Sequence, residues 1–292
     1  MKIRMKRTAD PAEEKRYYEP STAEIQDILM RGMKEFRDLC EEHRIHYQIM
    51  YGTLLGALRY GDFIPWDDDA DLIVARPDYD RLISLADQFD TEEWELITYH
   101  THEGYYIPWA KFAYKKSKLL PSRFNSGMVY GLAFDVFPFD FIDARNEQEA
   151  LREALRLHGR FTSVLQRLQP LAEIKPGRKN ALRRAGKKLF YETVGRLRGS
   201  APAEYEKLEA DLRKTLPDEN NYCCSVFGTL TFVYRTADFL KDEMMEIRGE
   251  SFRAPAGYPN ILAVRYGGDY MTPPPAEEQK ITHFYTLKIE KD

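Results

Sequence analysis

Residues 51–74 read YGTLLGALRYGDFIPWDDDADLIV, and this stretch decides the fold. Four of its aspartates fall within five positions, directly before the apolar run at residues 72–74: Asp67, Asp68, Asp69 and Asp71. Carboxylates repel one another, so such a cluster beside an apolar strand is poorly tolerated unless a cation compensates it. Successive side chains on a strand point to opposite faces, which puts Asp67, Asp69 and Asp71 on one side and Asp68 on the other.

Carboxylates that face one way are suited to a hard cation. Mg²⁺ prefers oxygen ligands and bridges substrate phosphates, and Mn²⁺ is the second candidate. A two-metal site needs a further acid from a neighbouring strand, and the run Phe134-Asp135-Val136-Phe137 supplies one. Two or three of Asp67, Asp69 and Asp71 can therefore converge on one cation, with Asp135 as the further acid.

Two other interpretations of the acidic cluster compete with a magnesium site. A calcium loop needs Gly at its sixth position and Glu at its twelfth, but counting from Asp67 gives Leu72 and Asp78. A solvated acidic loop that caps the following helix is disfavoured, because such loops seldom run directly into a core strand. For Asp135, a strand-edge or capping role remains the alternative.

A phosphate-binding turn is predicted at Gly52-Thr53, between an expected strand and a short helix. Backbone N–H groups and a hydroxyl at such a position can hold phosphate oxygens, although a Gly-Thr turn is more often plain chain punctuation. Arg59 and Lys111 are candidate counter-charges for a diphosphate, with solvated surface cations as the alternative. Trp66 stands beside the acids and is a further candidate for substrate binding.

Composition indicates a self-sufficient globular chain. Its 292 residues, 43% of them hydrophobic, are enough to bury a sizeable core. The formal charge of -4 provides no global attraction for nucleic acid or an anionic membrane. The three cysteines, Cys40, Cys223 and Cys224, fit buried thiols in a reducing compartment rather than a disulfide framework or a zinc site. We find no apolar leader or membrane span, and expect a cytoplasmic protein with at most peripheral contact at the inner face of the membrane.

Hydrophobic periodicity predicts an α/β (α+β) protein with a mixed sheet core and a mainly helical C-terminal half. Helices are expected at residues 21–43, 54–59, 77–85, 147–168 and 204–216, and strands at residues 46–50, 69–75, 94–99, 106–114 and 129–137. We divide the chain into an N-terminal extension (1–20), a catalytic core (21–145) and a mainly helical acceptor-side region of the same catalytic unit (146–292). Residues 169–180 are expected to form a loop.

Several sequence blocks together resemble the LicD family of phosphotransferases, relatives of fukutin. The first consists of GTLLGALR at residues 52–59 and FIPWDDDAD at residues 63–71. The others are WAKF around Lys111, GLAFDVFPFD at residues 131–140 and RYGGDYMTPP at residues 265–274. The resemblance extends from about residue 25 to 284. The last block departs from the family pattern by an extra Gly and an extra Pro.

This resemblance implies a nucleotidyltransferase-type fold and a Mg²⁺-dependent reaction. Gly52-Thr53 matches the family's phosphate-binding turn, Asp69 and Asp71 match its metal-binding pair, and Asp135 matches its third acid. Family members transfer phosphocholine, or another phosphoalcohol such as phosphoribitol, from a CDP-activated donor to a hydroxyl of a surface glycan, and CMP leaves. We therefore expect modification of lipopolysaccharide, teichoic acid or capsule, from a glycan or lipid-linked glycan acceptor.

Two groups of residues are assigned to the substrates on chemical grounds. Aromatic rings near the acids are candidates for a cation–π cage around choline, with core packing as the alternative: Tyr60, Phe63, Trp66, Tyr105, Tyr106 and Trp109. The stretch at residues 175–188 has seven basic residues and no acid, so it is a candidate site for an anionic acceptor, or else a solvated helix face.

Two other functions share the same fold. A nucleotidyltransferase of the antibiotic-modifying or nucleic-acid-directed kind would transfer the nucleotide and release pyrophosphate. A non-catalytic module that binds glycan or nucleotide would keep the fold alone. The second alternative is disfavoured because a binding module has no need for the three acids Asp69, Asp71 and Asp135.

Overall fold

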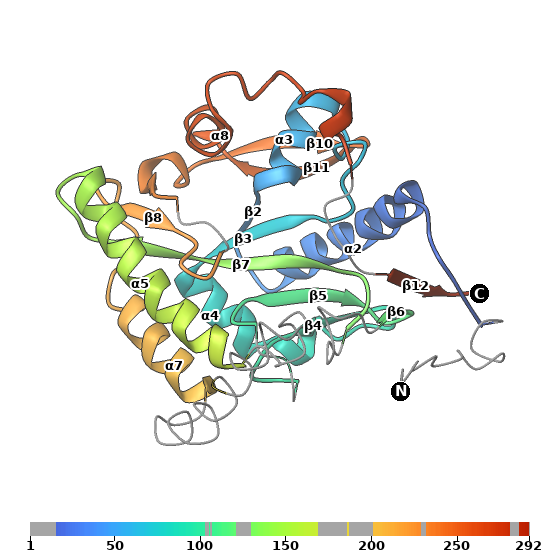
Figure 1. Cartoon of the computed structure of the whole chain (residues 1–292), viewed down its shortest axis with the longest axis horizontal. Coiled ribbons are helices and arrows are strands. Elements are labelled where there is room, and N and C mark those ends of the chain that lie inside the picture. Colours follow the sequence, from blue (N-terminus) through green and yellow to red (C-terminus); the bar gives the residue numbers. More distant parts are fainter. Residues whose placement is uncertain are drawn as a thin grey trace.

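A mixed sheet forms the centre of the molecule in the computed structural model, which describes residues 16–102, 105, 107–120, 130–168, 186, 201–228, 232–280 and 286–291 (Figure 1). The strand order is β2-β3-β7-β5-β4, and two further strands, β8 and β9, continue from β7. The bounds of these strands are Tyr47–Ile49 (β2), Asp71–Ala75 (β3), Ala133–Ile142 (β7), Ala110–Tyr114 (β5), Trp94–Ile97 (β4), Tyr222–Cys224 (β8) and Tyr234–Arg235 (β9). Strands β3 and β7 run parallel, whereas the other described pairs of this sheet are antiparallel. The predicted mixed α/β sheet is confirmed.

Helix α2 (Thr22–Glu42) confirms the first predicted helix and packs on the sheet. Its N-terminus is fixed by a capping box, because the Ser21 side chain accepts from the backbone of Glu24 and the Glu24 side chain accepts from the backbone of Ser21. At the centre of its apolar face, Phe36 lies edge-on to Phe112 of β5 and Phe134 of β7. This contact joins the N-terminal helix to the middle strands.

Helix α3 (Tyr51–Tyr60) begins three residues before the predicted start. Gly52 and Thr53, predicted as a turn ahead of the helix, lie in its first turn. The chain leaves β2 through an extended Met50 and enters the helix at Tyr51, whose φ is 51°. The helix ends at Gly61, where φ is 60°, a conformation that favours glycine.

The strands predicted around the acids and in the aromatic-rich runs are present: β3, β4 and β5 are shorter than expected, whereas β7 begins and ends later than expected. Helix α4 (Arg76–Ser84) follows β3 directly, with Pro77 in its first turn as predicted. The runs predicted to extend one sheet became β4, β5 and β7, and all three belong to the same sheet. Strand β7 continues to Ile142 because its last residues also pair with β8.

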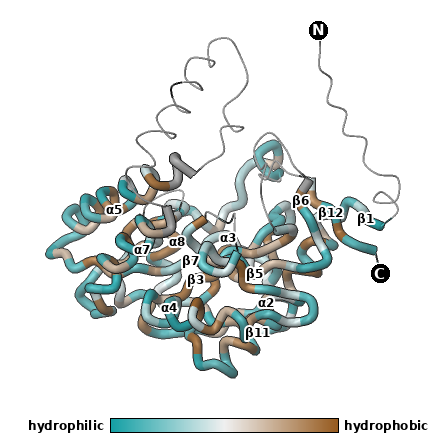
Figure 2. The backbone as a smooth tube through the Cα atoms, turned by 90° about the horizontal axis from the view of Figure 1, so that it is seen from below, coloured by the Kyte–Doolittle hydropathy of each residue, from teal (hydrophilic) through white to brown (hydrophobic). Residues whose placement is uncertain are grey.

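The C-terminal half contains more strand than predicted. Helices α5 (Glu147–Leu168) and α7 (Ala201–Leu212) confirm two predicted helices and lie side by side at one end of the sheet in both overall views (Figures 1 and 2). After them the chain adds β8, β9 and the hairpin of β10 (Asp242–Ile247) and β11 (Glu250–Pro255), and then the short helix α8 (Tyr258–Tyr266). The expectation of a mainly helical half therefore missed these strands. Strands β8 and β9 are short and β8 pairs with the distant β7, whereas β10 and β11 form a local hairpin that the sequence analysis overlooked.

The remaining elements close the edges of the structure. Strands β1 (Tyr17–Tyr18), β12 (Thr286–Glu290) and β6 (Ser117–Leu120) form a separate antiparallel sheet that brings the two ends of the described chain together. The short 3-10 helices are η1 (Ala86–Phe89), η4 (Thr236–Asp238) and η5 (Ala276–Glu278).

Some sequence predictions fall partly or wholly outside the described residues. The basic stretch at residues 175–188 is described at residue 186 alone, and the predicted loop at residues 169–180 and Tyr106 are not described. The three cysteines are buried as free thiols, as predicted. Within the described ranges, none of the helices has the length and apolar character needed to cross a bilayer.

A buried ionic network connects the helical pair to the sheet. The side chain of Arg76, at the start of α4, is 2% exposed, and its Nε donates to Asp140 Oδ1 of β7 at 2.6 Å. Its Nη1 lies 3.5 Å from Oε1 of Glu209 on α7. Asp140 and Glu209 are buried as well, so each charge depends on the others for compensation.

We predict that Asp140→Ala destabilises the protein by roughly 3–5 kcal/mol, since it leaves the Arg76 charge buried without its closest partner. Lys214→Ala is the control, because Lys214 forms an exposed pair with Asp211 and exposed pairs contribute ~1 kcal/mol or less. Denaturant unfolding of both variants measures the difference. Equal, small losses would show that the buried network does not hold α7 to the sheet.

Candidate functional site

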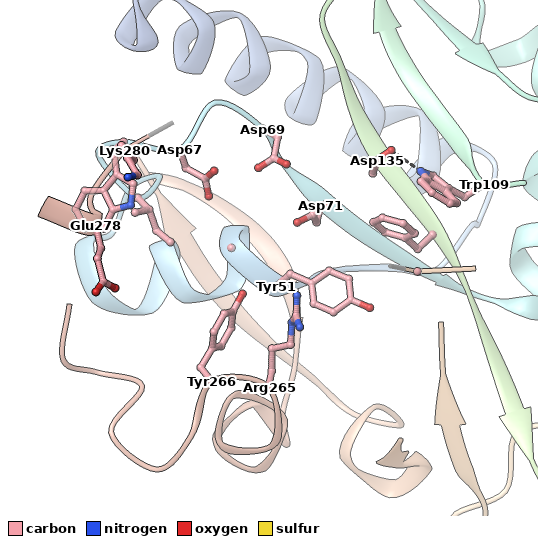
Figure 3. A pocket seen from close by; sticks show the side chains of 15 residues that line it. Tyr51, Asp67, Asp69, Asp71, Trp109, Asp135, Arg265, Tyr266, Glu278 and Lys280 are labelled. Carbon is pink, nitrogen blue, oxygen red and sulfur yellow. Dashed lines mark hydrogen bonds between the residues drawn. The ribbon is translucent and has the colours of Figure 1, made fainter. Parts of the chain in front are cut away.

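A cavity of about 560 Å³ opens where β3 and β7 meet the start of α3 and the segment that follows α8 (Figure 3). It is lined by four aspartates, several aromatic rings, and charged residues from the C-terminal segment: Tyr51, Gly52, Ile64, Trp66, Asp67, Asp69, Asp71, Trp109, Asp135, Phe137, Gly228, Arg265, Tyr266, Glu278 and Lys280. Both halves of the chain therefore contribute to one polar cavity.

The register of β3 and β7 brings the key carboxylates together. Asp71 is paired with Asp135 across these parallel strands, and the amide of Asp135 donates to the carbonyl of Ala70 at 3.0 Å. Residues in register on adjacent strands project their side chains to the same face. The third acid that the sequence analysis sought on a neighbouring strand thus lies beside Asp71.

The remaining acids of the cluster point to two different sides of the chain, as strand alternation predicted. Asp67 and Asp69 line the cavity, whereas Asp68 is buried away from it and is 5% exposed. The regular strand begins only at Asp71, so Asp67 and Asp69 reach the cavity from an extended loop. In Figure 3 the side chains of Asp67, Asp69 and Asp71 follow one another along the same wall.

Two buried polar side chains hold this acidic loop in place. Gln26 of α2 donates from its Nε2 to the carbonyl of Ile64 at 3.0 Å and to the carbonyl of Asp67 at 2.8 Å. Thr53 accepts a hydrogen bond from the amide of Asp71 at 2.8 Å, through its hydroxyl. The sequence analysis missed Gln26, because a single polar residue on the apolar face of a helix does not identify its distant partner.

Asp135 is held by two donors. Trp109 Nε1 donates to its Oδ1 at 2.6 Å, and the Lys111 ammonium forms an ion pair with the same oxygen. Burial alone lowers the pKa of Lys111, but the Asp135 carboxylate outweighs that effect and raises the pKa of Lys111 above its usual value. Lys111 is therefore charged and paired with the Asp135 carboxylate.

Asp71 carries the clearest electrostatic perturbation of the site. Burial raises the pKa of Asp71 well above its usual range, and the nearby charges of Asp69, Asp135 and Asp67 raise that pKa further. Lys111 acts in the opposite direction with a smaller effect. The wall therefore concentrates negative charge beyond what its own cations compensate, a property typical of functional sites.

The predicted phosphate-binding residues do not all reach the cavity. Gly52 lines it, and a Cβ atom added at Gly52 would lie 2.7 Å from Asp67 Oδ2, so glycine keeps this wall open. The Thr53 hydroxyl accepts a hydrogen bond from the Asp71 amide, and Thr53 is not among the residues that line the cavity. Arg59 does not line the cavity either, and its Nη2 donates to the backbone carbonyls of Tyr270 and Thr272.

Lys111 differs from the prediction in a similar way. It was expected as a diphosphate counter-charge, but it is engaged with Asp135 and is not among the residues that line the cavity. The physical reason is strand pairing, since Lys111 and Asp135 are register partners on β5 and β7. The sequence does not reveal which strands pair, so it could not identify Asp135 as the partner of Lys111.

The aromatic candidates are only partly assembled at the cavity. Trp66 and Trp109 line it, whereas Phe63 and Tyr105 are buried in the core and Tyr60 is 37% exposed elsewhere on α3. The sequence analysis missed three other aromatic residues that line the cavity, Tyr51, Phe137 and Tyr266. Arg265 and Tyr266 belong to the sequence block at residues 265–274, which could have indicated that they lie at the site.

The backbone at Tyr51 supports a functional role for this region. Its φ of 51° lies in the left-handed region, which a bulky residue occupies at a cost of about 1–3 kcal/mol. The conformation places the Tyr51 ring against Phe137 at a centroid distance of 5.8 Å, on the wall of the cavity. Strained backbone clusters at functional sites, although Arg44 and Arg248 adopt a similar φ outside this cavity.

The donor chemistry of the acidic wall fits a hard divalent cation. Within the described residues, no three His, Cys, Asp or Glu side chains already form a closed metal-binding group. However, Asp69, Asp71 and Asp135 share one cavity and supply oxygen ligands alone, and burial together with their mutual repulsion raises the pKa of Asp71. A cation between them would relieve that repulsion.

The fold is a mixed α/β domain in which carboxylates from adjacent strands face a polar cavity, as expected of the nucleotidyltransferase type. Residues 44–180 match the nucleotidyltransferase domain described as LicD/FKTN/FKRP. The chain therefore carries a LicD-family domain, as its sequence blocks indicated.

Individual relatives extend the similarity beyond that domain. The chain is 25% identical over 276 residues to the lipopolysaccharide cholinephosphotransferase LicD of Haemophilus influenzae, which covers 91% of this chain and 97% of the relative. It is 40% identical over 62 residues to the uncharacterized protein RP689 of Rickettsia prowazekii, covering 21% of this chain and 23% of the relative. The uncharacterized protein RT0683 of Rickettsia typhi is 38% identical over 61 residues, covering 21% and 20%.

We predict that Asp71→Asn raises thermal stability in metal-free buffer at neutral pH, because it removes one buried charge from the repelling group. The folded-state pKa of Asp71 is raised above its unfolded value, so the unsubstituted protein should gain stability as the pH falls through that folded pKa. Asp71→Asn should lack this pH-dependent gain in stability. Melting temperatures across pH in chelator measure both effects, with the exposed Asp87→Asn as control; identical pH profiles for all three proteins would contradict the pKa assignment.

Proposed function

We propose that this protein transfers a phosphoalcohol, phosphocholine, from a CDP-activated donor to a hydroxyl of a cell-surface glycan and releases CMP. The observation that carries the proposal is the pairing of Asp71 with Asp135 at the wall of a polar cavity. The LicD-family domain and the full-length similarity to a lipopolysaccharide cholinephosphotransferase support the same chemistry. Lipopolysaccharide, or a lipid-linked precursor of a comparable glycan, is the proposed acceptor.

Asp69, Asp71 and Asp135 are the proposed ligands of Mg²⁺, with Asp67 as a fourth candidate and Mn²⁺ as a substitute. The ion, when bound, would neutralise the diphosphate charge. The chain's own residues position the reactants: Gly52 keeps the cavity open beside Asp67, and the acids define where the diphosphate lies. Little covalent chemistry is required of the protein, so positioning and electrostatic stabilisation supply most of the rate.

Asp135 is the proposed acceptor of the proton from the attacking glycan hydroxyl. Trp109 and Lys111 both bind its Oδ1, and among the described residues no hydrogen-bond donor contacts Oδ2. This arrangement fixes the carboxylate while leaving one oxygen for another ligand. The new bond joins the hydroxyl oxygen to the phosphorus of phosphocholine, and the bond to the CMP oxygen breaks.

The two parts of the chain have separate roles in this proposal. Residues 21–145 supply the acidic wall, and residues 146–292 complete the same catalytic unit from the opposite side and face the acceptor. Gly228, Arg265, Tyr266 and Lys280 line the cavity from that second part, which supports a single shared site. Action at the inner face of the membrane would give access to lipid-linked acceptors.

The donor class can be tested directly. We expect CMP release from CDP-choline in the presence of Mg²⁺ and a lipopolysaccharide acceptor, and less from CDP-ribitol or CDP-glycerol. Chromatography of the nucleotide products makes the measurement. Pyrophosphate release from nucleoside triphosphates would instead favour a nucleotidyltransferase, and nucleotide or glycan binding with no product would favour a binding module.

The metal requirement forms a separate prediction. Chelator should abolish transfer, and Mg²⁺ or Mn²⁺ should restore it, whereas Zn²⁺ should restore it poorly because the site offers oxygen ligands. Asp69→Asn and Asp71→Asn should lose transfer without unfolding, as circular dichroism would show. Asp68→Asn is the matched control from the same cluster, since Asp68 does not line the cavity. Unchanged turnover in the Asp69 or Asp71 variant would remove the metal assignment.

A further inference from the structure

The wall of the cavity opposite the acids carries a cation that the sequence analysis did not place in the site. Arg265 lies in the last turn of α8, and Figure 3 shows it beside Tyr266 and beneath Tyr51, across from Asp69 and Asp71. The other lysine or arginine among the described lining residues is Lys280, which is exposed. Arg265 is thus the more enclosed cation facing the acidic wall.

Aromatic rings hold the Arg265 side chain in position. Its guanidinium carbon lies 4.8 Å from the ring centroid of Phe232, 5.4 Å from that of Tyr51 and 5.6 Å from that of Tyr266. Contacts of this kind favour the charged group over a ring face and restrict its motion. They orient the planar guanidinium without using its charge in an ion pair.

The described part of the protein provides no carboxylate to neutralise the charge of Arg265. Among the described residues, no carboxylate forms an ion pair with Arg265, and its buried Nε has no hydrogen-bond partner. The other cations expected near a diphosphate are committed elsewhere, Lys111 to Asp135 and Arg59 to backbone carbonyls. Arg265 therefore has the anion-binding capacity that those two residues lack.

We propose that Arg265 binds the diphosphate of the nucleotide donor, an assignment that rests on the proposed function. A guanidinium presents paired N–H donors that match phosphate oxygens, and it remains charged at any physiological pH. As the bond between phosphocholine and CMP breaks, the electron pair moves to the oxygen of the departing CMP phosphate. Arg265 stabilises that growing charge from the side opposite the carboxylates.

Arg59 has a positioning role in this arrangement. It lies on α3, and its Nη2 donates to the carbonyls of Tyr270 and Thr272, in the segment that follows α8. This contact fastens the C-terminal segment to the helix that begins at the cavity. The C-terminal half, expected to serve the acceptor, consequently supplies part of the donor site as well.

Nucleotide binding by the full-length protein tests the proposal. Calorimetry with CDP, CMP and cytidine in Mg²⁺ separates phosphate contacts from base contacts. Arg265→Gln should weaken CDP binding about 10- to 100-fold, the range expected for lost charged hydrogen bonds, while leaving cytidine binding unchanged. Arg265→Lys keeps the positive charge but removes the paired N–H donors of the guanidinium, so it should cause an intermediate loss of CDP affinity.

Arg235→Gln is the matched control, because Arg235 also lies over an aromatic ring, 5.4 Å from the centroid of Tyr222, but outside the cavity. It should bind CDP like the unsubstituted protein. In transfer assays Arg265→Gln should raise KM for the CDP donor and lower kcat, and melting curves show whether each variant is folded.

Three outcomes would overturn the assignment. Equal CDP affinity in the unsubstituted protein and Arg265→Gln would remove Arg265 from the donor site and leave the proposed function intact. Equal weakening of CDP and cytidine binding in both Arg265 variants would assign Arg265 a structural role. Failure of the unsubstituted protein to bind CDP more tightly than cytidine would overturn both the assignment and the proposed function.

Discussion

The parallel pairing of β3 with β7 is the constraint on which the site depends. It places Asp71 in register with Asp135, and burial together with like charges makes this an unfavourable arrangement for the protein alone. The surrounding structure maintains it through Gln26 and Thr53 on one side and through Trp109 and Lys111 on the other. The carboxylates of Asp71 and Asp135 are thus held close together at an energetic cost, which is the arrangement that a preorganised cation site would require.

The C-terminal half completes the site and does not merely flank it. The buried contact of Arg76 with Asp140 and Glu209 connects α7 to the strand that carries Asp135. The contacts from Arg59 to residues 270 and 272 hold the segment after α8 near the start of α3. Both connections join elements that are far apart in sequence, so the cavity exists only when both halves are folded.

The cavity has two chemically different walls. Carboxylates from β3 and β7 form one wall, and Arg265 with its aromatic neighbours forms part of the other. A diphosphate with a bound cation carries charges that suit both walls, whereas a neutral glycan would gain little from either. Under the proposed function, this asymmetry supports donor binding between the walls and acceptor approach from the open side.

The sequence by itself determined the acidic cluster, the first helix with its capping box, the helices after residues 77 and 147, and the family to which the motifs belong, because these features depend on local spacing. It also separated Asp68 from its neighbours through strand alternation. Only the tertiary structure decided the partners: Lys111 with Asp135, Arg59 with the C-terminal segment, and Arg265 opposite the acids. Strand pairing and helix packing set those contacts, and local periodicity carries no information about a partner that is 24 residues away, as for Lys111 and Asp135, or 211 residues away, as for Arg59 and Tyr270.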